Sequence, residues 1–485
     1  MDKVRLEKGI INQMLPFRLV SDSGFNFSDI NNDIWIKTNE DLTRLDFLLE
    51  HVKDFFSKDI VPGKEEESAC IIMKLKNDAP PVKLFNNKTY LLSNRSFENK
   101  NQTKNVVNFT VCFDPNSFRI VFHPSTKVGI LLFTIEAAKS SKNTEPQSLA
   151  DFVNMNYLLR MFNRNSESYL ISQNERPEER GKSKMLLTGK DINIFGKTET
   201  SNIELTGWRP GHLVNYLLHG INEKYKVELF DYNRVIPVCY VQPAEEITDD
   251  EIVRTTLFYL RKVYDFDHSP TYESLHQEKE IIHPYKQIYY ATSLERAVVL
   301  NNCSTTDSEF LKSFYTNSFQ KSVWLYILGV LQRAILLQLL KEVSDLDPDD
   351  PRIVKEYLKR YTSTSLKAIF SKVSVYHQHN DYYDMIIHNL QIHDLRSELK
   401  DELYELNNLQ RQFHEDEVEK DNEIEKQYDK RLNIILFVLS VFGLTELIYK
   451  VLENTEMSSL KHSLAFGIPV ILGFTFWKIL SIKRK

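Results

Sequence analysis

The C-terminal part of this sequence lacks, over a long stretch, the residues that normally end helices. No proline lies between Pro351 and Pro469, and no glycine lies between Gly329 and Gly443. Apolar residues recur from Ile392 onward at mixed spacings of three and four, the pattern of a helix with one apolar face. The sequence therefore predicts a single helix of about 60 residues.

Two apolar stretches near the C-terminus, 432–451 and 464–482, have the length of membrane spans. A hydrocarbon layer of about 30 Å takes roughly 20 mainly apolar residues to cross. The segment 452–463 between them is long enough for a turn, so a hairpin is expected. Cations lie at both outer flanks, which predicts that both chain termini are cytoplasmic. These cations are Lys426, Lys430 and Arg431 before the first span and Lys483, Arg484 and Lys485 after the second.

The first apolar stretch carries polar residues that a plain anchor does not need. Asn433 and Ser440 are costly in lipid unless they face water or a partner helix. Their spacing places them on one helical face together with polar residues of the preceding turns. If several copies stand around an axis, this face lines a water-filled pore. Its expected lining residues are Asn422, Lys426, Asp429, Asn433, Phe437, Ser440 and Leu444.

The composition excludes several classes of protein. The net charge of −6 argues against a surface that binds nucleic acid directly. Four widely spaced cysteines form no CxxC pair, so neither a zinc site nor a disulfide framework is expected. The N-terminus lacks the apolar core of a signal peptide.

No motif of enzyme chemistry is complete. Gly181-Lys182-Ser183 and Gly196-Lys197-Thr198 resemble the end of a phosphate-binding loop, but Arg176 and Asp191 occupy the positions of the required glycines. We therefore predict no catalytic residues, no metal ligands and no covalently bound cofactor.

The N-terminal 300 residues have the mixed pattern of an α+β domain. Segment 323–340 is apolar enough for a third span, but Gln332, Arg333 and Gln338 interrupt it, so a buried bundle helix is expected. Strands are expected at 69–75, 106–113, 118–122, 128–135, 226–230 and 236–241, and helices at 41–56, 149–162, 212–220 and 249–263.

The expected organisation has seven parts. These are an α/β sensor domain (1–300), a helical bundle (301–384), a long stalk helix (385–431), a first span (432–451), an outer loop (452–463), a second span (464–482) and a basic cytoplasmic tail (483–485).

This layout resembles the CorA family of magnesium channels, in which an α/β cytoplasmic domain precedes a stalk helix and two spans. That family carries a Gly-Met-Asn signature after an aromatic residue. The corresponding residues here are Phe442, Gly443, Leu444 and Thr445, which keep the aromatic residue and the glycine. The replaced Asn belongs to the ring that receives hydrated magnesium, so the resemblance does not carry magnesium selectivity with it.

The chain is more similar to a divergent CorA-like branch, the membrane effectors that accompany type III CRISPR systems. The similar segments are Lys127-Val128-Gly129-Ile130-Leu131 with the helix 151–163, the helix 324–340 with Gln332-Arg333, and Lys372-Val373-Ser374 leading into Tyr383.

The resemblance implies a homo-oligomeric, pentamer-like ring in the bacterial inner membrane that takes part in antiviral defence. Its activating ligand would be a nucleotide second messenger, an S-adenosylmethionine–AMP conjugate or a cyclic oligoadenylate, and a divalent cation is a further candidate ligand. Arg160, Lys182, Lys184 and Arg333 are candidate phosphate contacts, chosen for their charge. Two alternatives stay open: a divalent-cation channel, and a tail-anchored enzyme or scaffold.

Overall fold

The computed structural model describes most of the chain as two compact units. The first comprises Met1–Asp347 and Arg352–Leu403, and the second comprises Pro348–Pro351 and Tyr404–Lys485. The described residues are 1, 3–20, 34–57, 70–77, 79, 89–93, 108–137, 148–160, 169–172, 217–218, 225–230, 235–262, 264, 268–303, 309–346, 350–452, 467, 470–471 and 473–474.

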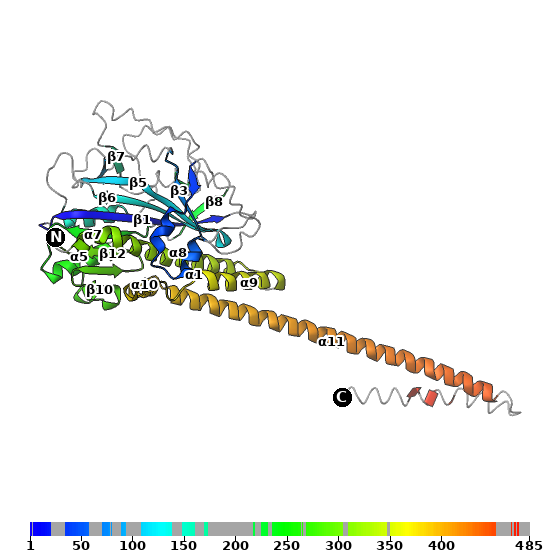
Figure 1. Cartoon of the computed structure of the whole chain (residues 1–485). Helices are drawn as coiled ribbons and strands as arrows, with labels where there is room; N and C mark the ends of the chain where they lie inside the picture. Colours follow the sequence, from blue (N-terminus) through cyan, green and yellow to red (C-terminus); the bar gives the residue numbers. More distant parts are fainter. Residues whose placement is uncertain are drawn as a thin grey trace, which may run out of the picture. The chain divides into compact units, whose positions relative to one another are not determined.

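The first unit is built on a mixed, mainly antiparallel sheet with the order β10-β11-β12-β9-β1-β6-β5-β3-β2 (Figure 1). The pair β12–β9 is parallel, while β8 adds to β1, and β4 adds to β5 and β7. The strands are β1 (Leu6–Val20), β2 (Trp35–Lys37), β3 (Ile71–Leu75), β4 (Thr89–Ser93), β5 (Asn108–His123), β6 (Val128–Ala137), β7 (Tyr169–Ser172), β8 (Lys226–Leu229), β9 (Val238–Pro243), β10 (Ile281–Tyr285), β11 (Ile288–Thr292) and β12 (Ala297–Asn301).

Strand β1 shows why the sheet separates two cores. Successive side chains of a strand point to opposite faces. Ile11 and Leu15 are buried in one core cluster, and Ile10 and Met14 are buried in the other. The central strand is therefore covered on both faces, as in a layered α/β domain.

Helices cover both faces of this sheet. Side chains of α3 and α5 belong to the first cluster, and those of α1, α8 and α10 belong to the second. The helices are η2 (Glu40–Leu45), α1 (Glu50–Ser57), η3 (Pro124–Thr126), α3 (Leu149–Leu158), α5 (Asp250–Lys262), α6 (Tyr272–Leu275), η5 (Glu278–Glu280), α7 (Glu309–Phe314), η6 (Tyr315–Phe319), α8 (Gln320–Ser344), α9 (Pro351–Ala368), α10 (His377–Asn389) and α11 (Ile392–Leu452). The expected mixed α/β domain is thus present, and it shares a core with the helices that follow it.

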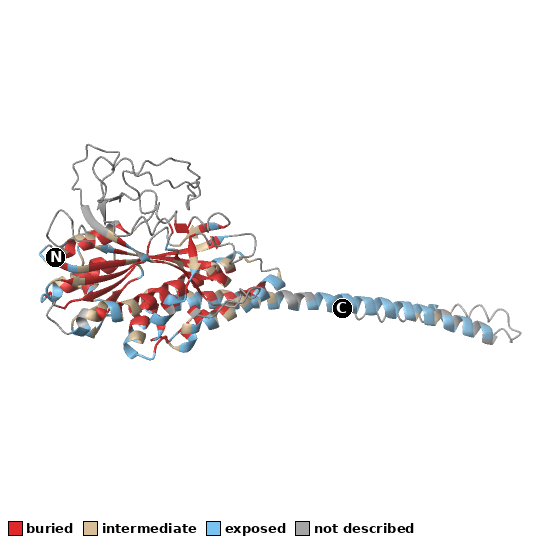
Figure 2. Ribbon diagram, turned by 45° about the horizontal axis from the view of Figure 1, so that its top comes forward, coloured by how far each residue is buried: buried red, intermediate tan, exposed pale blue. Residues whose placement is uncertain are grey.

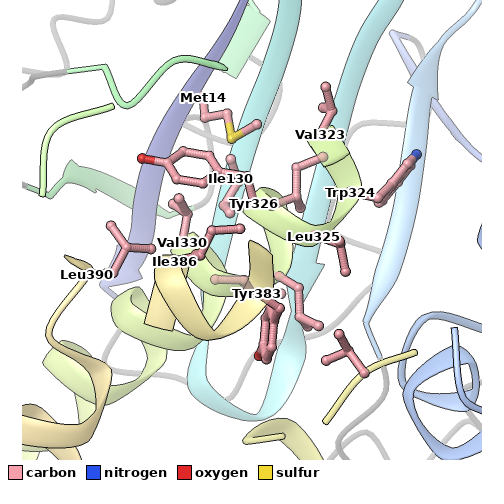
Figure 3. Close-up of a cluster of buried hydrophobic side chains, with 14 of the residues drawn as sticks. Met14, Ile130, Val323, Trp324, Leu325, Tyr326, Val330, Tyr383, Ile386 and Leu390 are labelled. Atoms are coloured by element: carbon pink, nitrogen blue, oxygen red, sulfur yellow. The ribbon is translucent and has the colours of Figure 1, made fainter. Parts of the chain in front are cut away.

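Helix α8 is the central helix of the second cluster. One helix in the described part of the chain, Tyr315–Ser344, is long and apolar enough to cross a membrane, and 78% of its most apolar part is buried in the protein. Figure 3 shows α8 side chains such as Tyr326 and Val330 between the sheet and α10. The prediction of a buried bundle helix for 323–340 is confirmed.

Helix α11 is the single long helix expected from the absence of proline and glycine, and it spans 61 residues. It begins at Ile392 and not at 385, the expected stalk boundary, which falls inside α10. The break has a local cause: Gln391 has a φ of 57°, a left-handed conformation that ends helices. Figure 2 shows that α11 is mainly exposed beyond Leu403.

Several other boundaries differ from expectation. Segments 106–113 and 118–122 form one strand, β5, and 41–56 divides into η2 and α1. The helix expected at 149–162 ends at Leu158, where Leu159 caps it. The expected helix 212–220 and the second span 464–482 lie mostly outside the described residues.

Candidate functional site

The first unit contains a polar cavity of about 760 Å³ between the sheet and the start of α8. Its walls come from β1, β3, β5 and β6, from η2, and from η6 with the first turns of α8. Apolar side chains such as Leu132, Val323 and Ile327 line one part of it, and charged or amide side chains line the rest. This volume is in the range of sites for small organic ligands.

A break in the pairing of β5 forms one wall. The register of β5 with β6 shifts between Asp114 and Arg119. The Asp114 carboxylate accepts a hydrogen bond from the Asn116 amide nitrogen (2.9 Å), and the Asp114 carbonyl accepts one from the Ser117 hydroxyl (2.7 Å). Such bulges redirect side chains and are common beside functional sites. Here Asp114, Asn116, Ser117 and Arg119 all line the cavity.

A π-helical turn forms the opposite wall. Residues Tyr315–Phe319 (η6) join α7 to α8 as a π-helix, in which each hydrogen bond spans five residues and not four. Such turns are rare in proteins as a whole, but those that occur often lie at functional sites. Tyr315, Thr316 and Asn317 line the cavity. Burial raises the pKa of Tyr315 to about 12, so its hydroxyl stays protonated and can donate a hydrogen bond at neutral pH.

The charged residues of the cavity form a network on η2 and its neighbouring strands. The Asp41 carboxylate pairs with Arg119 Nε at 2.7 Å and lies 3.9 Å from Arg44 Nη1. Glu40 pairs with Lys74, and a hydrogen bond from this lysine lowers the pKa of Glu40. Glu40 is therefore ionised at neutral pH, and Glu40 and Asp41 hold Lys74 and Arg119 in place.

Arg160 and Arg333, two of the four phosphate contacts expected from sequence, do not line this cavity. Arg160 donates to the Tyr157 carbonyl (2.8 Å), and its guanidinium lies 3.5 Å from the centre of the Tyr157 ring. Arg333 donates to the Leu390 carbonyl (2.9 Å). Both arginines thus satisfy carbonyls at helix ends. Lys182 and Lys184 lie outside the described residues.

The expected pore-lining residues share one face of α11. Asn422, Lys426, Asp429, Asn433, Ser440 and Leu444 are exposed, and Phe437 is partly exposed. The Ser440 hydroxyl donates to the Leu436 carbonyl (2.7 Å), so its hydrogen-bonding need is met within the helix. Of the signature positions, Gly443 is exposed, and the side chains of Phe442 and Thr445 lie outside the described set.

Possible metal ligands do not gather in the described part of the chain. No group of three or more His, Cys, Asp or Glu side chains is arranged to hold a metal ion there. The four cysteines are free thiols, and Cys70, Cys239 and Cys303 are buried.

Sequence reasoning missed the cavity because its residues come from distant segments. A signal existed at Glu40, Asp41 and Arg44, which bring three charges into one short turn, but a solvated helix face explains that pattern equally well. Comparison with family models, curated proteins and solved structures finds no match to this chain.

Proposed function

We propose that this protein is a ligand-gated membrane effector of CorA-like layout. In this proposal, several copies form a ring, the N-terminal α/β unit binds a nucleotide messenger, and the C-terminal helices form a pore that opens when the messenger binds. The setting implied by the resemblance is antiviral defence of the type III CRISPR kind. The observation that carries the proposal is the uncovered apolar end of α11.

Eight large apolar side chains of that end are exposed: Leu432, Ile434, Ile435, Leu436, Val438, Leu439, Leu444 and Leu447, each 43% or more. Removing such side chains from water is worth about 1.5–3 kcal/mol each, so leaving them half-exposed forgoes on the order of 10 kcal/mol. Monomeric soluble proteins rarely expose a contiguous apolar surface of this kind. Lipid, or other copies of this chain, could bury these side chains on a helix of this length.

The comparison with α8 supports this interpretation. Both segments are mainly apolar, but α8 is largely buried by the sheet and α10, whereas the apolar side chains named above at the end of α11 are exposed. Val470, Ile471 and Phe474 of the second expected span are also exposed, each 63% or more.

The beginning of α11 supports the proposed coupling. Ile392, Leu399 and Leu403 are buried in the core of the first unit, and the same helix continues without interruption to Leu452. A helix of 61 residues is about 90 Å long at 1.5 Å per residue. One stiff element thus begins in the sensor core and ends in the apolar segment.

The proposal is tested by ion flux through liposomes that contain the purified full chain. Flux is measured without nucleotide, with a cyclic oligoadenylate and with an S-adenosylmethionine–AMP conjugate. We expect flux with one of the nucleotides only. Asn433→Leu should reduce it at least tenfold, because an apolar ring excludes water from a narrow pore. Ser440→Ala is the matched control and should change it less than twofold, because the Ser440 hydroxyl bonds to its own helix.

Two results would refute the proposal in favour of the alternatives. Magnesium flux without any nucleotide would indicate a divalent-cation channel. No ion flux under any condition, together with membrane retention that is the same in the Asn433→Leu variant as in the unmodified chain, would indicate a tail-anchored enzyme or scaffold.

A further inference from the structure

The cavity beside η6 carries more positive than negative charge where its walls converge. Asp41 pairs with Arg119 and lies near Arg44, and Glu40 also acts electrostatically on both cations. The Asp41 side chain is 6% exposed, whereas that of Arg44 is 59% exposed. The buried carboxylate and Arg119 therefore form a fixed pair, and Arg44 is held only at 3.9 Å, which leaves its donors available to a ligand.

Lys321 adds a second available cation on the opposite wall. It lies in the first turn of α8 and lines the same cavity. Among the described residues it has no carboxylate partner, and its ammonium group lies 5.8 Å from the centre of the Phe47 ring. The pKa of His379 is lowered mainly by burial, and the positive charge of Lys321 is the second cause, so this charge acts beyond the Phe47 contact. Arg44 and Lys321 thus approach one space from two elements.

The cavity floor contributes an unused hydrogen-bond donor. The Asn12 side-chain oxygen accepts a bond from the Thr134 hydroxyl (2.7 Å). Its amide nitrogen is buried and has no hydrogen-bond partner among the described residues. A buried donor without an acceptor costs about 1–3 kcal/mol. A ligand rich in acceptor oxygens would remove that cost.

We infer that this cavity binds a phosphate-bearing small molecule, with Arg44 and Lys321 contacting the phosphate and Asn12 donating to an acceptor at the floor. Asp114 restricts the choice: its carboxylate on the β5 wall accepts a hydrogen bond from the Asn116 amide and has no cationic partner among the described residues, so its charge disfavours a ligand whose negative charge fills the whole space. The ligand is therefore a phosphate ester with a neutral polar part, and not a polyanion. The inference deepens the proposed function, on which the ligand's role rests, but its binding is independent of any pore.

The closing experiment measures binding to the full chain in detergent, with AMP and inorganic pyrophosphate as the probes, by calorimetry and by thermal unfolding. We expect AMP to bind and to raise the unfolding temperature. Lys321→Ala and Arg44→Ala should each weaken AMP binding about tenfold, the value of one charge-assisted hydrogen bond. Lys341→Ala is the matched control, because Lys341 lies exposed on the same helix away from the cavity, and it should leave AMP binding unchanged.

The two probes separate the sources of affinity. AMP binding at least tenfold tighter than pyrophosphate supports recognition of an ester with a neutral part. Tighter binding of pyrophosphate, no binding of either probe at millimolar concentration, or equal weakening by Lys321→Ala and Lys341→Ala would each overturn the inference. AMP binding that opens no pore would leave this inference standing and count against the proposed function alone, so the two failures are distinguishable.

Discussion

Gly329 offers a sharp test of the packing that holds the start of α11. It lies in α8, where a Cβ would meet Ile386 Cγ2 of α10 at 2.5 Å and Leu390 Cδ1 at 3.2 Å. Both distances are shorter than the 3.5–4.0 Å of a normal carbon contact, and both partners are fully buried. The Gly329→Ala substitution therefore forces α8 and α10 apart unless a side chain moves.

The magnitude follows from two opposing terms. Alanine favours the helix by about 1 kcal/mol over glycine, and overpacking of a tight core costs about 1–3 kcal/mol. We expect Gly329→Ala to lower the free energy of unfolding by up to about 2 kcal/mol. The Ile386→Ala substitution alone should lower the free energy of unfolding by about 2–5 kcal/mol, and it removes the Cγ2 atom that a Cβ at position 329 would meet. In this background the same Gly329→Ala change should raise the free energy of unfolding by about 1 kcal/mol or more.

The assay is urea unfolding of the four proteins of this double-mutant cycle in detergent, followed by circular dichroism. Residues in direct contact are expected to give an interaction energy of about 1–3 kcal/mol. If Gly329→Ala stabilises the protein equally in both backgrounds, α8 and α10 are not in close contact at this position, and the reasoning is refuted.

Three further predictions follow from buried titratable groups and from the apolar end of α11. Burial lowers the pKa of His123 to about 3, so below its unfolded pKa of about 6.5 the unfolded chain binds a proton that the native chain does not. The native state should lose about 1.4 kcal/mol per pH unit through this residue as pH falls from about 6.5 toward 3, and in urea unfolding at several pH values His123→Asn should be less pH-dependent by that slope. Burial raises the pKa of the Cys70 and Cys112 thiols, and it raises the pKa of Cys239 to about 12. Cys112 is the only one of the three that is not fully buried, so a thiol reagent should modify it before Cys70 and Cys239. Modification of all three at one rate in native protein would contradict their burial. A chain truncated after Lys430 should remain soluble without detergent, whereas the full chain should sediment with membranes, and equal solubility of both would show that the end of α11 needs no lipid.

Sequence reasoning predicted the fold best in segments whose structure is decided by a single local rule. The absence of proline and glycine predicted one long helix in this part of the chain, because nothing in that stretch competes with helix, but it did not predict the break at Gln391 that separates α10 from α11. Strand β1 was missed because Gly9, Asn12 and Pro16 interrupt its alternation, and only pairing with β6 and β9 makes it the centre of the sheet. Tertiary context overrides local propensity in such a strand.

The site was less accessible to sequence reasoning for a physical reason. Cations chosen for charge alone, Arg160 and Arg333, satisfy carbonyls at helix ends, a role that depends on where those helices stop. The cavity brings Arg44, Arg119 and Lys321 together from segments far apart in the chain. Its two distinguishing irregularities, the bulge in β5 and the π-helical turn before α8, arise from pairing and packing and leave no pattern in the residues themselves.

Helix α8 connects the two features on which the proposed function depends. Its first turns, with Lys321 and Trp324, line the cavity. Three turns later, Gln332 accepts a hydrogen bond from the Tyr383 hydroxyl of α10 (2.8 Å), and Arg333 donates to the Leu390 carbonyl (2.9 Å), directly before the turn that begins α11. A close-packed protein interior has low compressibility, so a displacement of a buried helix is passed on to the side chains packed against it. A π-helical turn at its N-terminus holds one residue more than an α-helical turn, so its conversion would shift α8 by about 1.5 Å along its axis. Ligand contact with η6 would therefore reach Leu390 through a single element, and no chain of loosely coupled loops is needed.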